Sequence, residues 1–364
     1  MSRLPSVLLC GPSRAAVSGV STHINQLFRS SIAHKYAIFQ FQVGSEGRDE
    51  THRQKTFRFF ISPIALMVAI IRHKAKIVHL NTSMDAKAYW RDLIYLCLSK
   101  LLGRRVIYQI HGGELPSRFF GRNRVAQSFL RWTLSIPDVI VVLAKIERNA
   151  YERFSAGRRI EVIPNAIDLD DYRGMAERDY ERPVVRLGYI GRLSKDKGIK
   201  ETIEAVGALR RRGLKSICLR IAGSGPYEGE LRELVRSESL EESVDILGPV
   251  FGREKMTFWR ETDLFIFPSY REGLPYAVLE ALASGTPVIS TRVGGIPDVV
   301  QEGVQGVFVN THDSPAIAAA IESLLSDRQR LRLMSRAAIE RARTHYAVER
   351  LAVQFDRLYQ ELLA

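Results

Sequence analysis

Short apolar runs alternate with longer amphipathic segments along the first half of the chain. Each run is apolar at consecutive positions and rich in β-branched residues, which is typical of strands buried on both faces of a parallel sheet. The segments at 21–31, 89–102 and 122–135 have helical periodicity. The predicted strands of this half are 6–11, 76–83, 104–113, 138–144 and 160–168.

The same alternation begins again after a charged stretch at 171–183, which predicts a linker. The predicted strands of the second half are 184–191, 217–223, 244–250, 264–269, 287–291 and 306–310. The helices between them are predicted near 198–211, 227–237, 253–260 and 275–284. Strand–helix alternation in both halves predicts an α/β protein of two doubly wound, Rossmann-like domains.

We divide the chain into an N-terminal domain at 1–170, a C-terminal domain at 171–345 and an amphipathic helix at 346–364. We expect this last helix to cross back and pack on the first domain. Open α/β sheets bind ligands beyond the carboxyl ends of their strands. We therefore expect the functional residues at these edges, facing one another across a cleft between the domains.

Composition places the chain among globular proteins, with 46% hydrophobic and 26% charged residues. The longest apolar run, at 59–71, is interrupted by Pro63 and is too short to span a bilayer. Cys10, Cys97 and Cys218 have neither metal-ligand spacing nor a disulfide pattern, which indicates a reducing compartment. We expect a soluble, cytoplasmic protein.

The net charge is +13, and nearly all of the excess lies in the first half. Residues 1–172 carry 25 Lys and Arg against 13 Asp and Glu, whereas residues 173–364 carry 28 against 27. This asymmetry indicates an anionic partner for the first half: a lipid headgroup surface, a phosphorylated acceptor or nucleic acid. A basic surface that only aids solubility is the alternative.

The stretch SYREGLPYAVLEALASGTPVI places Glu272 before an apolar helix and Glu280 inside it. Pro275 suits the first helical position, and Gly285 suits the residue that ends the helix. Glu280 then leans back towards the loop that holds Glu272. The helix N-terminus favours a phosphate, whereas carboxylates favour hydroxyl groups, and a sugar nucleotide offers both. The alternative is a helix-start Glu272 with a solvated Glu280.

A second cluster follows the strand that ends at Gly191. Arg192 and Lys197 precede the next helix, where two cations can clamp a diphosphate, although two unrelated surface cations would give the same pattern. Gly223 marks another junction of strand, glycine and helix, and Val250 lies in the loop after a third strand. These loops predict a row of ligand-binding segments along one edge of the sheet.

Taken in order, GYIGRLSKDKG, IAGSGP, LGPV, FPSYREGLPYAVLEALASGTPVI and VGGIPDVV resemble the donor domain of the retaining glycosyltransferases of family 4, which have the GT-B fold. The resemblance is close over 160–311 and looser before it, through SGVSTHI, HLNTS, IHGGE and VIPNAID. It implies transfer of a sugar from a UDP- or GDP-linked donor to a saccharide or lipid-linked saccharide, without a metal or another cofactor. It also implies a role in cell-surface polysaccharide or glycolipid biosynthesis.

The resemblance implies roles for individual residues. Arg192 and Lys197 would bind the donor diphosphate and stabilise the departing nucleoside diphosphate. Glu272 would contact hydroxyls of the transferred sugar, Glu280 would hold the ribose, and His111 would lie near the reacting centre on the acceptor side. The remaining donor contacts would come from the backbone at Gly19, Gly191, Gly223, Val250, Gly273 and Leu274.

Two positions depart from the family pattern. Ser18 stands where many members have a second glycine, so it could crowd the donor or reshape the acceptor pocket. HGGE replaces the commoner His-Asp pair, which leaves Glu114 without an assigned role. For His111, a strand-end histidine satisfied by the backbone is the alternative.

The segment GRNRVAQSFLRWTLS combines Arg122, Arg124 and Arg131 with Phe129 and Trp132. Such a face is typical of a helix at a membrane interface, and it predicts peripheral association with the inner face of a membrane that carries the acceptor. The alternative is that Phe129 and Trp132 pack in the core.

Other function classes fit the sequence less well. A non-catalytic basic protein that binds nucleic acid or a membrane surface is one alternative, but no nucleic-acid motif is present, so we expect no nucleic-acid partner. An oxidoreductase or epimerase would need G-x-G-x-x-G after the first strand, and CGPSRAAVSG lacks that spacing. An enzyme similar to glycogen phosphorylase would need pyridoxal phosphate and a far longer chain.

Overall fold

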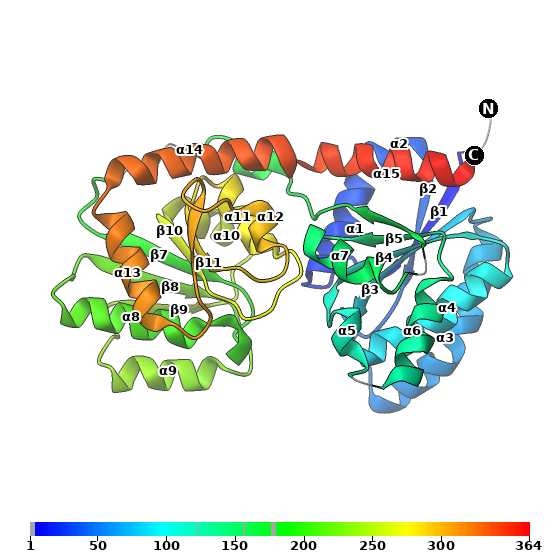
Figure 1. Ribbon diagram of the computed structural model, residues 1–364, viewed down its shortest axis with the longest axis horizontal. Coiled ribbons are helices and arrows are strands. Elements are labelled where there is room, and N and C mark those ends of the chain that lie inside the picture. The colour runs from blue at the N-terminus through cyan, green and yellow to red at the C-terminus, as the bar shows by residue number, and fades with distance from the viewer. Residues whose placement is uncertain (1–3, 122, 156, 176–179) are drawn as a thin grey trace. The chain divides into compact units, whose positions relative to one another are not determined.

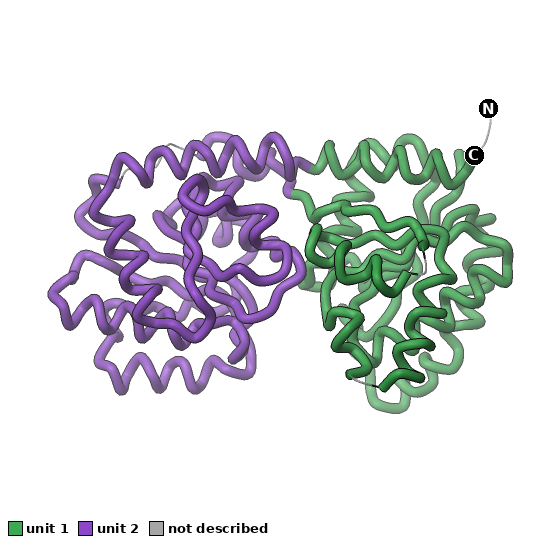
Figure 2. Tube along the Cα trace, viewed as in Figure 1, with its two compact units in different colours: residues 1–166, 348–364 green, residues 167–347 purple. Residues whose placement is uncertain are grey.

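The computed structural model describes residues 4–121, 123–155, 157–175 and 180–364, so Arg122 of the expected interfacial segment lies outside the described residues. The chain forms two compact units, which Figure 2 shows in different colours. Unit 1 consists of Met1–Ala166 and Val348–Ala364, and unit 2 of Ile167–Ala347. The chain passes from one unit to the other after Ala166 and again after Ala347, near the expected boundaries at 170 and 345. The two connecting segments are hydrogen-bonded to each other, because the Ile167 N–H donates to the Tyr346 carbonyl at 2.7 Å.

Unit 1 contains a six-stranded parallel sheet in the order β2-β1-β3-β4-β5-β6. Its strands are β1 (Ser6–Gly11), β2 (Ala37–Gln42), β3 (Ile77–Met84), β4 (Arg105–Gly113), β5 (Val139–Val142) and β6 (Arg159–Val162). The strand order reverses between β1 and β3. That reversal is the topological switch point, beside which doubly wound sheets bind ligands.

Helices cover both faces of this sheet (Figure 1). They are α1 (Gly19–Arg29), α2 (Ile32–Lys35), α3 (His52–Arg72), α4 (Ala86–Leu101), α5 (Pro116–Phe119), α6 (Arg124–Leu134), α7 (Lys145–Glu152) and α15 (Val348–Leu363). Alternate residues of β1 serve the two faces, as the pleat requires. Val7 and Leu9 pack with α1, α2 and α15, whereas Leu8 and Cys10 pack with α3, α4 and α6.

The last helix, α15, completes the core of unit 1. Leu351, Phe355 and Tyr359 are buried in the same hydrophobic cluster as Val7 and Leu9 of β1. Segments from the two ends of the chain therefore share one core.

Unit 2 has its own six-stranded parallel sheet, in the order β12-β11-β10-β7-β8-β9. Its strands are β7 (Val185–Ile190), β8 (Ile217–Ala222), β9 (Val244–Gly248), β10 (Leu264–Phe267), β11 (Val288–Thr291) and β12 (Gly306–Val309). This is the Rossmann order, and its switch point lies between β7 and β10. The prediction of two doubly wound α/β units is confirmed.

Among the helices of unit 2, α8 packs with α9 and α13, α11 packs with α12 and α14, and α13 also contacts α14. Their bounds are α8 (Ile199–Arg211), α9 (Glu228–Ser237), α10 (Gly252–Glu261), α11 (Tyr276–Ala283), α12 (Ile296–Val299), α13 (Ser314–Leu325) and α14 (Arg328–His345). Gly285 follows the end of α11 with φ +71°, as its sequence position predicts. Pro275 is the residue before the first turn rather than the first helical residue.

Pro63 does not interrupt the apolar segment of unit 1, contrary to our expectation. It lies inside α3, a helix of 21 residues that starts with a capping box at Thr51 and Gln54. Proline removes the donor for the carbonyl four residues earlier. Here the Ser62 hydroxyl donates to that carbonyl, on Phe59, at 3.4 Å. Within the described ranges, α3 is the one helix whose length and composition would suffice to cross a membrane.

Candidate active site

Unit 2 has a cavity of about 590 Å³ at its topological switch point. Arg192 and Lys197 enter it from the loop after β7, and Glu272 enters from the loop after β10. The carboxyl ends of neighbouring parallel strands meet at one edge, so residues far apart in sequence come together there. The structure therefore unites three of the four residues expected to act in catalysis.

Lys197 and Glu272 form an ion pair inside this cavity. Nζ of Lys197 lies 2.5 Å from Oε1 of Glu272, and only 17% and 12% of the two side chains is exposed. Each group is the counter-ion of the other. A ligand that gives Lys197 a phosphate and gives Glu272 hydroxyl groups would leave neither charge without a partner.

Arg192 is exposed at the edge of the same cavity. Among the described residues, no carboxylate forms an ion pair with its guanidinium group. The backbone beneath it is fixed, because the Tyr189 hydroxyl donates to the Arg192 carbonyl at 3.1 Å. Burial, together with the nearby charges of Glu272 and Asp196, raises the pKa of Tyr189 well above its usual value, so this donor stays neutral. Arg192 is thus a positioned cation with free hydrogen-bond donors.

Two glycines allow the loops of the cavity to touch backbone to backbone. Gly198 has φ +67°, and a Cβ there would lie 2.2 Å from the carbonyl oxygen of Pro268. Gly294 has φ +53°, and its Cβ would lie 2.1 Å from the carbonyl oxygen of Glu272. A side chain at Gly198 would push the Lys197 and Glu272 loops apart, and one at Gly294 would push the loop after β11 away from the Glu272 loop.

Gly191, Gly223 and Val250 lie in three adjacent loops at the same sheet edge. The Gly191 N–H donates to the Ala222 carbonyl at 3.0 Å, and the Gly223 N–H donates to the Gly248 carbonyl at 2.8 Å. Gly191 lines the cavity, whereas Gly223 and Val250 lie outside its lining. The row of loops expected from the sequence is therefore present, with the cavity at one end of it.

The backbone before α11 carries the other two residues expected to bind the donor. The Gly273 carbonyl accepts a hydrogen bond from the Gly295 N–H at 2.6 Å. Leu274 is buried, and its side chain belongs to the core. The N–H groups of these two residues lie between Glu272 and Pro275, which both line the cavity.

Glu280 differs from its expected position. It is buried and lies outside the cavity lining, so it does not converge with Glu272. Its carboxylate accepts hydrogen bonds from Lys255 Nζ at 2.8 Å and from Trp259 Nε1 at 3.0 Å, both on α10. The face of α11 that carries this side chain is turned to α10.

The other two expected site residues belong to unit 1. Gly19 is the first residue of α1, where Ser18 is the N-cap and its hydroxyl oxygen accepts from the Ser21 N–H at 3.3 Å. Capping explains why a serine can occupy this position. His111 lies near the end of β4, and its Nε2–H donates to Oδ1 of Asn81 at 2.9 Å. A side chain, not the backbone, therefore orients the imidazole.

Three histidines of unit 1 form a cluster that the sequence did not predict, in which His23 and His79 are buried and His111 is half-buried. The ring of His23 lies 4.9 Å from that of His111 and 6.4 Å from that of His79, centroid to centroid. His79 donates through Nε2 to Gln109 at 2.8 Å and accepts at Nδ1 from the Tyr359 hydroxyl at 2.9 Å. These partners fix one neutral tautomer. The motifs STHI, HLNTS and IHGGE contain the three histidines, but their meeting depends on the fold.

Burial keeps this cluster uncharged. It lowers the pKa of His79 to about 4, and burial together with the charge of His79 lowers the pKa of His111 to about 3. The pKa of His23 is well below its usual value for the same reasons. In the part of the chain that the structure describes, neither ring nitrogen of His23 has a hydrogen-bond partner. His111 is therefore a neutral imidazole at physiological pH.

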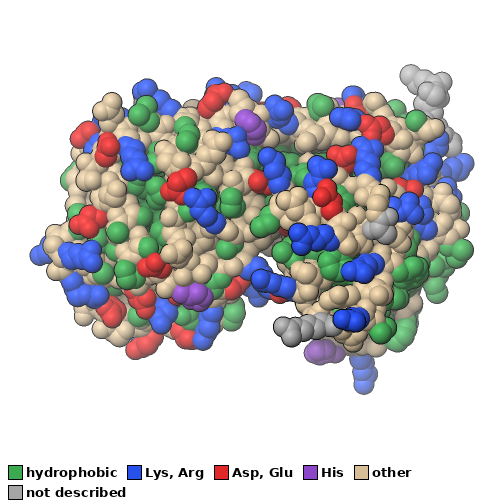
Figure 3. Space-filling view, viewed as in Figure 1, with side chains coloured by type: hydrophobic (Ala, Val, Ile, Leu, Met, Phe, Trp, Pro, Cys, Tyr) green, Lys and Arg blue, Asp and Glu red, His purple; other side chains and the backbone are tan. Residues whose placement is uncertain are grey.

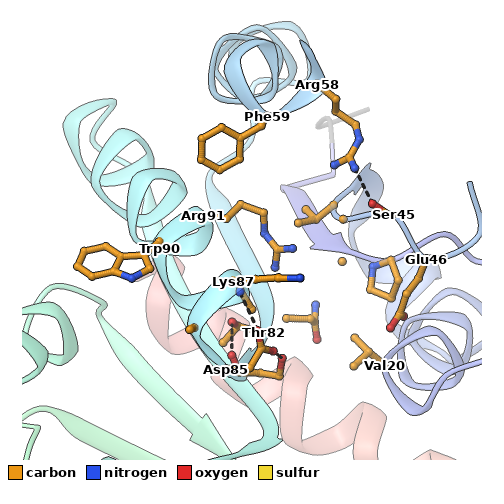
Figure 4. Close-up of a pocket in the computed structure, with 18 of the residues that line it drawn as sticks. Val20, Ser45, Glu46, Arg58, Phe59, Thr82, Asp85, Lys87, Trp90 and Arg91 are labelled. Carbon is orange, nitrogen blue, oxygen red and sulfur yellow. Dashed lines mark hydrogen bonds between the residues drawn. The ribbon is translucent and has the colours of Figure 1, made fainter. Parts of the chain in front are cut away.

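A second cavity, of about 660 Å³, lies at the β1/β3 switch point of unit 1. Its basic side chains come from α3 and α4, and Figure 4 shows Lys87 and Arg91 extending into it below Arg58 and Phe59. Arg91 pairs with buried Asp92 at 2.7 Å. The sequence predicts a basic first half of the chain, but it does not predict this pocket.

The cations at this cavity differ in their ion pairs. Arg58 pairs with Glu50 at 2.9 Å, whereas Lys55 and Lys87 make no ion pair with any described residue. Glu46 and Asp85 also line the cavity, so a ligand there meets the two lysines together with carboxylates.

The aromatic residues of α6 combine the two interpretations proposed for them. Phe129 is partly buried against the core and stacks on Trp90 with ring centroids 5.7 Å apart, whereas Trp132 is half exposed.

Over the described ranges, no group of three or more His, Cys, Asp or Glu side chains could hold a metal ion.

Two family models match the chain. A model of group 1 glycosyl transferases matches residues 181–343, and a model of Glycosyltransferase Family 4 matches residues 17–171. The D-inositol 3-phosphate glycosyltransferase of Corynebacterium aurimucosum is 30% identical over 243 residues, or 62% of this chain. The chain spans only 58% of that relative's length. The GDP-mannose-dependent alpha-(1-6)-phosphatidylinositol monomannoside mannosyltransferase of Mycobacterium tuberculosis is 28% identical over 89% of each protein.

Solved structures show the same fold at low sequence identity. Sucrose-phosphate synthase from Thermosynechococcus elongatus has a TM-score of 0.79 at 19% identity and covers 99% of both chains. Anabaena HepE in complex with UDP-glucose has a TM-score of 0.76 at 17% identity, over 98% of this chain and 99% of its own. Since one family model matches each unit, the chain belongs to the group 1, family 4 glycosyltransferases, which have the GT-B fold.

Proposed function

We propose that this glycosyltransferase is a retaining, metal-independent hexosyltransferase that moves a sugar from a UDP- or GDP-linked donor to a saccharide or lipid-linked saccharide. The observation that carries the proposal is the cavity at the β7/β10 switch point, in which Lys197 and Glu272 are paired and Arg192 is free. A nucleotide sugar has an anionic diphosphate beside several hydroxyl groups. This cavity combines the cations and the carboxylate that recognise those two features.

Arg192 and Lys197 bind the diphosphate in the proposed complex. Negative charge grows on the leaving diphosphate as its bond to the anomeric carbon breaks, so cations fixed in advance stabilise the transition state more than the ground state. Glu272 accepts hydrogen bonds from hydroxyls of the transferred sugar and holds its anomeric carbon in place. Two cations supply the charge that a metal ion would otherwise supply, and for this reason we propose a metal-independent reaction.

The remaining donor contacts follow from the positions of the loops. The N–H groups of Gly273 and Leu274 face the phosphates or the sugar at the start of α11, and the loop with Val250 lines the base. Gly191 and Gly223 let the donor approach the backbone. A carboxylate has about four acceptor sites, and Lys255 and Trp259 use two of those on Glu280, which leaves others for a ribose hydroxyl.

His111 and Gly19 act on the acceptor side in this proposal. The imidazole of His111 is neutral, so it orients the sugar or the acceptor by hydrogen bonds and not by charge. Retention follows if the acceptor oxygen attacks the anomeric carbon from the face that the diphosphate leaves. The acceptor proton then passes to an oxygen of the departing phosphate. The glycosidic bond forms as the bond between the anomeric carbon and the diphosphate oxygen breaks.

A phosphorylated or lipid-linked acceptor fits the second cavity. Lys55 and Lys87 place unpaired positive charge at the β1/β3 switch point of unit 1. The names of two relatives give an inositol phosphate and a phosphatidylinositol mannoside as their acceptors, which supports the same chemical class here. We place the enzyme in cell-surface polysaccharide or glycolipid biosynthesis, in the cytoplasm at the inner face of the membrane.

A panel of UDP- and GDP-linked sugars tests the proposal through binding and through slow hydrolysis of the donor. Lys197→Ala and Glu272→Ala should weaken binding and turnover of the best donor. Lys195→Ala is the matched control, because this lysine lies in the same turn but pairs with Glu230 at the surface. If Lys197→Ala and Lys195→Ala behave alike, the donor site is elsewhere. If the chelated enzyme hydrolyses the donor only after a divalent cation is added, the proposal of a metal-independent reaction is wrong.

A further inference from the structure

One face of α3 exposes a continuous apolar stripe. Its members recur at intervals of three and four residues, so they share one side of the helix. Between 39% and 70% of each member is exposed to solvent. They are Phe57, Phe60, Ile61, Ile64, Val68 and Ile71, and we refer to them as the α3 face.

Neighbouring helices extend this apolar surface. α3 packs against α4, on which Trp90 and Ile94 are 49% and 40% exposed. Figure 3 shows hydrophobic side chains gathered over this part of unit 1, at the lower right of the view. Single exposed apolar residues are normal on a protein surface, but a contiguous patch of this kind marks an interaction site.

Basic residues predominate around the α3 face, although Glu50, just before α3, pairs with Arg58. Residues 51–84 contain six Lys and Arg and no Asp or Glu. Arg53 and Lys55 lie in the first turns of α3, whereas Arg72, Lys74 and Lys76 lie at its end or just beyond. An apolar face with cations at both ends of the helix complements a surface that is apolar within and anionic at its boundary.

A second copy of this chain fits the α3 face poorly. Contact between two such faces would place the cations of one helix close to those of the other, and like charges across an interface oppose association. An anionic lipid bilayer has the opposite charge at its boundary and an apolar interior.

The positions of its charges and its packing indicate that α3 lies on a bilayer and does not cross it. Only Phe59–Ile71 is free of charged side chains, which is about 20 Å of helix at 1.5 Å per residue. The hydrocarbon layer is about 30 Å thick. The opposite side of the helix is not free either, because Leu66 and Ile70 are fully buried in the core of unit 1.

We propose that unit 1 docks on an anionic lipid bilayer through the α3 face, with α3 in the plane of the interface. Lys55, Arg58 and Phe59 belong to the first turns of α3 and also line the unit 1 cavity. Docking would therefore place that cavity at the level of the lipid headgroups, where a lipid-linked acceptor presents its phosphate and sugar. This deepens the proposed function and rests on its lipid-linked acceptor, but the docking itself needs no catalysis.

Sedimentation with vesicles tests the docking. The full chain should bind vesicles of phosphatidylcholine and phosphatidylglycerol and should bind pure phosphatidylcholine much less, and salt should weaken the binding. Ile64→Ser with Val68→Ser should weaken it by about tenfold or more, because two apolar side chains no longer enter the bilayer. Leu333→Ser with Val353→Ser is the matched control, since it removes two exposed apolar side chains from α14 and α15. This control should bind as the unmodified chain does.

Depth in the bilayer gives an independent measurement. Ile64→Trp in a Trp90→Phe/Trp132→Phe chain should be quenched by brominated lipids, whereas Leu333→Trp in the same chain should not. Equal quenching of both, or equal vesicle binding by both double serine variants, would overturn the proposal. So would a dimer of the unmodified chain that dissociates with Ile64→Ser/Val68→Ser and does not bind vesicles.

Donor binding separates this inference from the proposed function. Every variant should still bind the best nucleotide sugar, which also shows that it is folded. Intact donor binding without vesicle binding would reject the docking alone. Vesicle binding without any nucleotide-sugar binding would reject the proposed donor site and leave the docking.

Discussion

Nζ of Lys197 lies 2.5 Å from Oε1 of Glu272, although the two residues belong to loops that follow different strands of unit 2. Both side chains are largely shielded from water, so each charge depends on the other for its solvation. In the proposed donor complex, Lys197 binds the diphosphate and Glu272 binds hydroxyls of the transferred sugar.

Removing both members of this pair should cost less stability than the two single removals added together. Lys197→Met and Glu272→Gln should each destabilise unit 2, whereas the double variant should lose less than the sum by about 0.5–3 kcal/mol. Urea unfolding of the four chains in a double-mutant cycle measures this coupling. Strictly additive losses would show that the two charges are independently solvated.

Lys197→Met should also lower kcat by about 10²–10³, the range for loss of one preorganised donor.

Acid should destabilise unit 1 because of its histidine cluster. The folded pKa values of His79 and His111, about 4 and 3, lie below the ordinary histidine value of about 6.5, so the unfolded chain binds more protons in between. Stability is therefore complete above about pH 6.5 and falls as the pH drops towards 4, by up to about 1.4 kcal/mol per pH unit for each histidine.

Urea midpoints followed by the fluorescence of Trp90 and Trp132 in unit 1 measure that dependence, in a Trp259→Phe chain. His111→Gln should reduce the slope between pH 6.5 and 4, whereas His34→Gln, on the surface of the same unit, should leave it unchanged. A slope that is the same in both variants would show that His111 does not contribute.

Substitutions of Glu280 should separate its structural contacts from its proposed contact with ribose. Glu280→Ala removes the carboxylate that accepts a hydrogen bond from fully buried Trp259, which should cost about 1–3 kcal/mol of unfolding free energy. Glu280→Gln keeps an acceptor for Trp259 and should cost less, while it still raises the KM for the donor. Thermal unfolding and donor kinetics on both variants test this. A donor KM unchanged in Glu280→Gln would restrict Glu280 to a structural role.

The unpaired lysines of the unit 1 cavity should contribute to acceptor affinity but not to stability. Lys55→Gln and Lys87→Gln should each raise the KM for a phosphorylated acceptor about three- to tenfold at low salt, and less at high salt. Their Tm should stay within about 2 °C of the original, since neither lysine has an ion pair to lose among the described residues. Lys215→Gln, an exposed lysine of unit 2, is the control. A salt-independent effect would indicate that charge is not the cause.

Strands bounded by clear turn residues could be predicted closely from the sequence. β1 occupies Ser6–Gly11, as predicted, because an unbroken apolar run lies between Pro5 and a glycine. β2 was not predicted, because Gln40 and Gln42 break the apolar run of Ala37–Gln42, and as an edge strand it has all its side chains half-buried. α3 was missed because Pro63 indicates a break, and the contact by which Ser62 compensates for it is visible only in the structure.

Residues of the site could be predicted from local sequence, but their partners could not. The meeting of Lys197 with Glu272 follows from the rule that strand ends share an edge. The contact of Glu280 with Trp259 depends on how α10 and α11 are rotated against each other, which no periodicity determines. The His79–Tyr359 hydrogen bond joins residues 280 positions apart and requires that α15 return to unit 1.

That return of α15 has a consequence for biosynthesis. Because Leu351, Phe355 and Tyr359 fill the core of unit 1, the first unit to leave the ribosome cannot finish folding until the last segment of the chain has been translated. Unit 2 is continuous from Ile167 to Ala347, so it is fully translated before α15 and can fold before unit 1 is complete. Until then the nascent chain exposes a sheet face that chaperones can bind, and a ribosome that stops before α15 releases a protein whose histidine cluster has lost its cover.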